Sequence, residues 1–173
     1  FKKTIFIIIF STLMLPVEVR IVPTFQVVAS MGLLNNFSGL TLPLIASATA
    51  TFLFRQFFQT LPKELLEAAR IDGAGPFRFF YDVVLPLSKT NIAALFIIMF
   101  IYGWNQYLWP LVVTTKAQMT TIVMGIQNLA SVADEIPQWH SIMAVAICAM
   151  LPPLLVIIFM QRLFEKGLFE MDK

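Results

Sequence analysis

The chain of 173 residues is 58% hydrophobic and only 13% charged, whereas a soluble domain carries about 25% charged residues, so its composition favours a membrane protein. Its net charge of +2 is too small to indicate a nucleic-acid partner, and its single cysteine, Cys148, excludes both a disulfide framework and a CxxC site. The chain begins at Phe1 and becomes apolar at once, without a signal-peptide processing site. We therefore expect a fragment that lacks N-terminal sequence.

Four apolar stretches have the length of a membrane-spanning helix. A helix of about 20 residues crosses the hydrocarbon core of a bilayer and satisfies its own backbone hydrogen bonds there. In chain order the stretches cover about residues 4–25, 37–58, 91–113 and 141–161. The sequence therefore predicts an all-α, polytopic helical bundle that forms a single domain over residues 1–173.

The first stretch contains two charged residues, Glu18 and Arg20, shortly after Pro16. An ionisable side chain inside a membrane is a candidate functional residue by default, and we expect a role for this pair in a translocation pathway or gate. A simpler interpretation stays open, because long charged side chains near the end of a span can reach the membrane surface.

The segment between the second and third stretches, residues 59–90, reads as two short helices. Thr60 is expected to cap the first helix, and Gly73 follows its end. Pro76 is expected to begin the second helix and Pro86 to end it. The second helix carries large side chains at the i, i+3, i+4, i+7 spacing of one helix face, namely Phe77, Phe80, Tyr81 and Val84.

The third stretch contains the most polar part of any predicted span. The residues that we expect to line a pathway are Tyr102, Trp104, Asn105 and Gln106. Aromatic rings and amides suit ligands with hydroxyl groups, and an amide N–H can also donate to a phosphate oxygen. The alternative is an aromatic belt at the membrane surface with an amide bonded between helices.

No metal site is expected, since the only histidine, His140, has no partner ligands in the sequence around it.

The distribution of Lys and Arg predicts the orientation of these stretches. Of the 12 cations, all except Arg20 and Lys116 lie before the first stretch, between residues 55 and 89, or after the fourth. Because cytoplasmic segments are enriched in Lys and Arg, both termini and the loop 59–90 are predicted to be cytoplasmic. Exposed aromatic side chains in that loop need a cover, either from the chain's own helices or from a separate soluble partner.

The spacing within the loop resembles the EAA loop of permeases from binding-protein-dependent ABC importers. Glu67-Ala68-Ala69 is followed at the family's intervals by Gly73 and then by Val83, Leu85 and Pro86, with Val83 in place of isoleucine. The resemblance implies a coupling loop that docks in a groove on an ATP-binding subunit. The residues that it assigns to this loop are Glu67, Ala68, Ala69, Gly73, Phe77, Phe80, Leu85 and Pro86, with Glu67 paired to a basic residue of that subunit.

The resemblance covers nearly the whole chain and implies a type I ABC importer transmembrane domain with four of its expected six spans. "PVEVR" and "GWNQYLWP" favour the branch that imports sn-glycerol-3-phosphate or glycerophosphodiesters, and a sugar permease or a non-conducting membrane scaffold are the alternatives. The implied partners are a second permease subunit in a heterodimer, a dimeric ATP-binding subunit, a periplasmic or lipid-anchored substrate-binding protein, and the bilayer of the inner membrane. No cofactor is implied, and ATP hydrolysis would belong to the partner because this sequence has no GxxxxGK[ST] motif.

Overall fold

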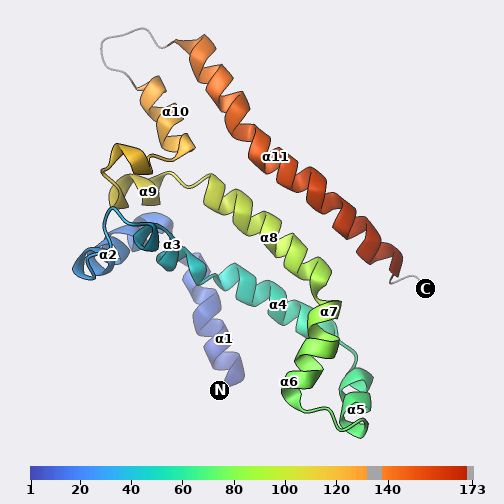
Figure 1. Ribbon diagram of the computed structural model, residues 1–173. Coiled ribbons are helices and arrows are strands. Elements are labelled where there is room, and N and C mark those ends of the chain that lie inside the picture. Colours follow the sequence, from blue (N-terminus) through green and yellow to red (C-terminus); the bar gives the residue numbers. More distant parts are fainter. Residues whose placement is uncertain (132–137, 171–173) are drawn as a thin grey trace. The chain divides into compact units, whose positions relative to one another are not determined.

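All regular secondary structure described in this chain is helical, which confirms the all-α expectation (Figure 1). The computed structural model describes residues 1–131 and 138–170, and for residues 162–170 it describes the backbone alone. The α-helices are α1 (Lys2–Ser11), α2 (Val17–Ser30), α3 (Phe37–Ile45), α4 (Ala48–Thr60), α5 (Lys63–Ile71), α6 (Pro76–Phe79), α7 (Leu85–Leu87), α8 (Lys89–Trp104), α9 (Leu108–Val113), α10 (Ile122–Ala130) and α11 (Trp139–Glu170). Short 3-10 helices cover Thr12–Met14 and Ala117–Met119, and Phe80–Val84 is π-helical.

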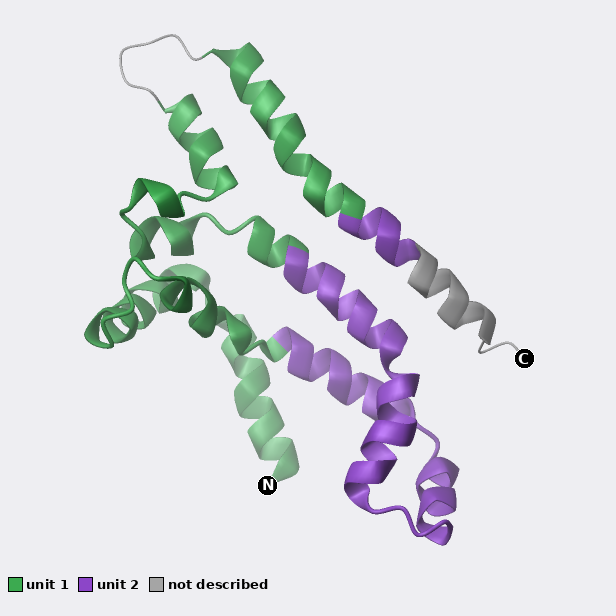
Figure 2. Ribbon diagram, viewed as in Figure 1, with its two compact units in different colours: residues 1–48, 101–155 green, residues 49–100, 156–173 purple. Residues whose placement is uncertain are grey.

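The helices group into two compact units, each of which combines segments distant in the sequence (Figure 2). Unit 1 comprises residues 1–48 and 101–155, and unit 2 comprises residues 49–100 and 156–173. The predicted coupling loop therefore belongs to unit 2, while all the predicted pathway residues belong to unit 1. The two candidate sites are described separately for this reason.

Two helical segments are long and apolar enough to cross a membrane, namely Phe37–Thr60 and Trp139–Gln161. Two further pairs of helices qualify only if each bent pair counts as one span, and their bends are 105° and 68°. Among the described residues this gives two to four candidate spans, and four stays a prediction. In the most apolar part of these two segments only 6% and 11% of the residues are buried, so lipid or other subunits must cover most of their surface.

The expectation of one continuous helix over residues 4–25 is wrong. The chain turns by 105° between Lys2–Met14 and Val17–Ser30. Leu15 has an extended backbone with ψ 120°, because the ring of Pro16 disfavours a helical conformation for the residue before it. The second helix of the pair then continues to Ser30, beyond the predicted end.

The third predicted span also ends earlier than expected, because α8 stops at Trp104 and a separate short helix, α9, follows at Leu108. The side-chain amides of the next two residues bond to carbonyls in the last turn of α8. Asn105 Nδ2 donates to the Ile101 carbonyl at 3.0 Å, and Gln106 Nε2 donates to the Tyr102 carbonyl at 3.3 Å. Side chains that bind nearby backbone carbonyls compete with a continuing helix.

The core of unit 1 joins α2, α3 and α9. Its buried members are Val28, Trp109 and Val113, which are 4%, 5% and 1% exposed. The Trp109 indole N–H donates to the Leu40 carbonyl at 3.2 Å and so ties α9 to α3. Partly buried apolar side chains pack around this centre, namely Ile21, Phe25, Leu33, Leu40 and Leu44.

Candidate functional site

The predicted coupling loop begins with α5, whose C-terminal end is closed by a Schellman motif at Gly73. The Gly73 N–H donates to the Arg70 carbonyl at 3.1 Å, and the Ala74 N–H donates to the Ala69 carbonyl at 2.8 Å. This motif needs a left-handed residue, and Gly73 has φ +73°. Only glycine adopts that conformation without a steric cost, so this residue determines the direction in which the chain leaves α5.

Two details of the loop differ from the prediction. Thr60 is the last residue of α4, and its hydroxyl donates to the Phe57 carbonyl at 2.7 Å, so it does not cap α5. Pro76 does begin α6, but Pro86 does not end the helix, since helical structure continues to Leu87. The π-helical turn at Phe80–Val84 precedes Pro86 and widens the helix where a proline ring would otherwise clash.

The π-helical turn also rearranges the aromatic face that the sequence predicts. Val84 is buried at 7% exposure, whereas the three aromatic members of the expected face are exposed. Phe77 is the most exposed of them at 82%, and the rings of Phe80 and Tyr81 meet edge to face with centroids 5.5 Å apart. The expectation of one continuous face is therefore wrong, and the aromatic side chains project from the loop.

The EAA residues of α5 divide between a buried and an exposed side. Ala69 is buried, while Glu67 and Ala68 are exposed. Glu67 forms no ion pair with any side chain that the structure describes, in contrast to Arg78 and Asp82, which pair at 3.2 Å. We give the name coupling surface to five exposed side chains of this predicted coupling loop, namely Glu67, Ile71, Phe77, Phe80 and Tyr81.

The remaining loop residues connect this surface to α8. Leu85 and Pro86 are exposed, and the next buried residue is Ser88 at 3% exposure. The Ser88 N–H donates to the Val84 carbonyl at 3.0 Å, and its hydroxyl donates to the Leu85 carbonyl at 2.9 Å. These bonds lie at the 68° bend between Pro76–Leu87 and Lys89–Trp104.

The predicted pathway residues of unit 1 fall into two groups. Glu18 lies in the first turn of α2, where a carboxylate favourably faces the helix N-terminus, and both Glu18 and Arg20 are exposed. Within the described residues, no hydrogen bond or ion pair joins either of them to the second group, which lies at the end of α8. In that group Tyr102 is 46% exposed, whereas the Trp104 indole N–H reaches the Ala149 carbonyl at 3.0 Å.

A cavity of about 350 Å³ lies beside the end of α8. Gln106 lines it, and it is the only predicted pathway residue that does so. The other polar lining residues are Thr41 and Thr121, which sequence reasoning missed because neither stands near the "GWNQYLWP" segment. Leucine, isoleucine, proline and tryptophan side chains make up most of the wall, so the cavity offers few polar groups and no cation.

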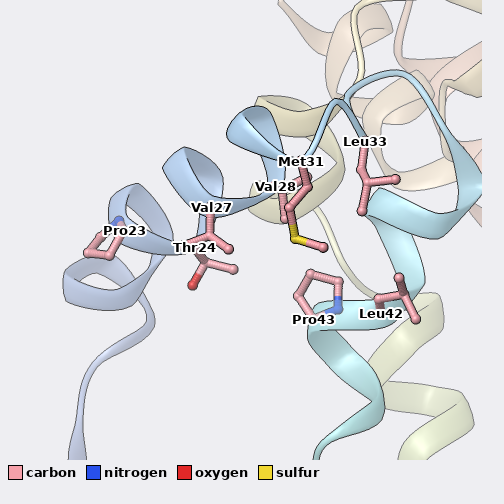
Figure 3. Close-up of a pocket in the computed structure, with 8 residues that line it drawn as sticks. All are labelled: Pro23, Thr24, Val27, Val28, Met31, Leu33, Leu42 and Pro43. Carbon is pink, nitrogen blue, oxygen red and sulfur yellow. The ribbon is translucent and has the colours of Figure 1, made fainter.

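A second cavity, of about 410 Å³, lies between α2 and α3 and is almost entirely apolar (Figure 3). Its lining consists of Pro23, Thr24, Val27, Val28, Met31, Leu33, Leu42 and Pro43. The one hydroxyl, on Thr24, already donates to the Arg20 carbonyl at 2.8 Å. Besides the oxygen of this hydroxyl, the side chains that line the cavity offer a ligand no polar group and no cation.

Asn35 is a structural residue that the sequence analysis missed. It has φ 55°, and its Oδ1 accepts from the Thr115 N–H at 2.7 Å, the Lys116 N–H at 3.1 Å and the Thr115 hydroxyl at 3.2 Å. Its own N–H donates to the Val113 carbonyl at 3.0 Å. One side chain thus joins the connection before α3 to the connection after α9. No local pattern signals a contact between residues 80 positions apart.

We expect Asn35→Ala to destabilise the protein by about 2–4 kcal/mol, since it removes the acceptor of three hydrogen bonds and places an alanine in a left-handed conformation. Asn35→Gly separates the two causes, because glycine relieves the strain but still lacks the acceptor. Thermal unfolding of both variants in detergent is the measurement. Wild-type stability of both variants would show that the three hydrogen bonds contribute nothing.

The described side chains contain no group of three His, Cys, Asp or Glu residues that could hold a metal ion.

Comparison with known proteins decides the family. Residues 1–170 match the model of the family described as "Binding-protein-dependent transport system inner membrane component". The chain belongs to this family. Its helical fold is thus that of an inner-membrane transport component.

Curated relatives of this inner-membrane component are named sn-glycerol-3-phosphate transport system permease protein UgpE. The protein from Brucella melitensis is 62% identical over 168 residues, which is 97% of this chain and 60% of the relative. The protein from Agrobacterium fabrum is 60% identical over 173 residues, which is 100% of this chain and 61% of the relative. The chain therefore spans about three fifths of the length of these relatives.

A solved structure shares the fold. It is titled as the crystal structure of a bacterial ABC transporter involved in the import of the acidic polysaccharide alginate, and it matches with a TM-score of 0.78 at 21% identity. The match covers 94% of this chain and 62% of that chain. This likeness confirms the fold of an ABC importer transmembrane domain.

Proposed function

We propose that this chain is part of the permease subunit of an ATP-driven importer for sn-glycerol-3-phosphate or its diesters. The observation that carries the proposal is the identity of 60–62%, over nearly the whole chain, to permeases named for that substrate. Import of a sugar is the main alternative, and a non-conducting membrane scaffold is the other. The chain would move substrate by alternating access between inward-facing and outward-facing states.

The coupling surface of unit 2 would be the contact through which ATP hydrolysis in the partner subunit moves this chain. A dimeric ATP-binding subunit on the cytoplasmic side would enclose the exposed apolar side chains, and one of its basic residues would pair with Glu67. The exposure of Phe77 and the unpaired state of Glu67 within the described residues support this role. Movement of the loop would then reach α8 through the bonded joint at Ser88.

The substrate would pass through unit 1 together with a second permease subunit in a heterodimer. Gln106, on the wall of the cavity beside α8, is the residue of this chain best placed to meet a hydroxyl or phosphate oxygen. Tyr102, Glu18 and Arg20 are exposed and would contribute only where the partner permease completes the pathway. A periplasmic or lipid-anchored binding protein would deliver the substrate to the outer side.

Glu67→Gln is expected to weaken association with the ATP-binding subunit by about 30-fold or more, since truncating one partner of a buried charge pair costs about 2–5 kcal/mol. Glu64→Gln is the matched control, because it removes the same charge from an exposed position of α5 outside the EAA motif. Affinity would be measured by titrating the ATP-binding subunit against the full-length permease pair in nanodiscs. Equal losses for both variants would contradict a specific role for Glu67.

The proposed function is tested in liposomes that contain the full-length permease, its second permease and the ATP-binding subunit. ATP hydrolysis is measured with the binding protein loaded in turn with glycerol phosphate, a glycerophosphodiester and a neutral disaccharide. Stimulation by the two phosphate compounds alone is the expected result. Stimulation by the disaccharide alone would indicate that the substrate is a sugar. No stimulation of an assembled complex by any of the three would favour the non-conducting membrane scaffold.

A further inference from the structure

The middle of α11 contains a backbone carbonyl that its own helix cannot satisfy. In an α-helix the carbonyl of Ala149 would accept from the N–H of residue 153, and in a 3-10 turn from that of residue 152. Both positions are prolines, which have no N–H, and α11 continues through them. Ala149 is only 8% exposed, and a buried carbonyl without a donor is costly, above all in a membrane.

The donor comes from another helix. The indole N–H of Trp104, the last residue of α8, donates to the Ala149 carbonyl at 3.0 Å. Trp104 immediately precedes the break at residues 105–107, which carries the candidate pathway amides. All of these residues belong to unit 1.

We infer that Trp104 is a positioning residue, whose hydrogen bond to the Ala149 carbonyl holds the polar break after α8 against the prolines of α11. We call this hydrogen bond the latch. An arrangement of the permease in which Trp104 and Ala149 separate leaves this carbonyl without a donor. The latch therefore biases the protein toward the arrangement in which the two helices meet. Its geometry stands independently of the proposed substrate, whereas its role in transport rests on the proposed function.

The contact between Trp109 and Leu40 shows why the latch is more than an ordinary tryptophan hydrogen bond. The Trp109 indole N–H also donates to a carbonyl, at 3.2 Å. However, the carbonyl of Leu40 lies four residues before Leu44, which lies in α3 and has its own N–H. If the Trp109 donor is lost, the Leu40 carbonyl still has a backbone N–H as a partner. If the Trp104 donor is lost, the Ala149 carbonyl has no backbone donor in an α-helical or 3-10 pattern.

A double-mutant cycle in the full-length permease tests the inference. Trp104→Phe keeps an aromatic ring but removes the donor, and Pro153→Ala gives α11 its own N–H for the Ala149 carbonyl. The first readout is the equilibrium constant for unfolding in mixed detergent micelles. We expect Trp104→Phe alone to raise it by about 3-fold, and at most about 20-fold, as for other hydrogen bonds between membrane helices. In the Pro153→Ala background the same change should have almost no effect.

The second readout is the distance between spin labels at two exposed positions, Leu108 and Met150, on the two sides of the latch. We expect a narrow distance distribution in the otherwise native protein and a broad one in Trp104→Phe. Pro153→Ala should restore the stability of Trp104→Phe but not its narrow distribution, because a backbone donor satisfies the carbonyl without holding α8. If Trp104 acted through packing alone, Pro153→Ala would not restore the stability while the distance distribution stays broad.

Two results would overturn the inference. An equal loss of stability from Trp104→Phe in both backgrounds would mean that the side chain acts through packing and not through its N–H. An unchanged distance distribution in Trp104→Phe would mean that it does not position the break. Should a variant fail to fold, hydrogen exchange of the Trp104 indole N–H in the native sequence replaces the cycle. Exchange as fast as at Trp139, which is 60% exposed, would exclude the latch.

Discussion

Gly73→Pro is expected to reduce ATP-driven uptake by about 100-fold or more while the membrane helices stay folded. Proline fixes φ near −65°, whereas Gly73 requires φ +73° and donates its N–H to the Arg70 carbonyl. The loss of the left-handed turn and of that bond costs about 3 kcal/mol locally, which corresponds to a factor of about 100 in an equilibrium constant. The coupling surface would then no longer be held in one orientation.

Gly75→Ala is the matched control for this prediction, because it changes a glycine two residues away in the same connection. Gly75 has φ −71° and ψ 168°, an extended conformation that alanine adopts freely, and no atom lies within 4 Å of an added Cβ. Uptake by Gly75→Ala should be close to normal. Normal uptake by a correctly assembled Gly73→Pro complex would contradict the role assigned to the loop.

Gly39→Val is expected to cause a large loss of folded protein. Gly39 is buried in α3, and any Cβ built on it collides with the backbone carbonyl of Leu33 and approaches Val28 Cγ1 to 3.3 Å. Leu33 cannot move away easily, because its N–H donates to the Val28 carbonyl at 3.1 Å in the turn that ends α2. Overpacking of this kind costs about 1–3 kcal/mol, and more where backbone must shift.

Gly125→Val provides the comparison for Gly39→Val, since Gly125 is also helical but has no atom within 4 Å of an added Cβ. The measurement is the yield of monodisperse permease after extraction from the membrane, together with its thermal unfolding midpoint. We expect a loss of yield for Gly39→Val and almost none for Gly125→Val. Similar yields for the two variants would show that α3 does not pack closely against the end of α2.

Much of the loop architecture could be predicted because its signals are local. Glycine after a helical segment and proline at its start act within a few residues, so the end of α5 near Gly73 and the start of α6 at Pro76 follow from the sequence. The helical class likewise follows from composition and apolar length. The π-helical turn before Pro86 has no comparable local signature.

The break at Pro16 shows a different limit. Pro23 and Pro43 also occur in apolar stretches, yet both lie inside helices, whereas the chain bends by 105° before Pro16. Which proline interrupts a helix depends on the packing available to each half, and a run of apolar letters does not contain that information. The continuous helix expected over residues 4–25 was therefore wrong.

Two contacts of unit 1 were beyond sequence reasoning because they join distant segments. Asn35 bonds to residues 80 positions later, and Trp104 reaches a carbonyl 45 positions later. The two prolines of α11 were visible in the sequence, and they indicate a carbonyl without a helical donor. The sequence does not indicate which side chain supplies the donor.

The most direct test of this account is site-specific photo-crosslinking from the coupling surface in the assembled full-length transporter. A photoreactive amino acid replaces Phe77 in one variant and Leu129 of α10 in another, since both side chains are exposed. Position 129 lies between the third and fourth predicted spans, in a connection that the distribution of Lys and Arg predicts to be on the outer side. The account predicts that position 77 crosslinks to the ATP-binding subunit and that position 129 does not. A crosslink to that subunit from position 129, with none from position 77, would contradict both the orientation and the coupling role of the loop.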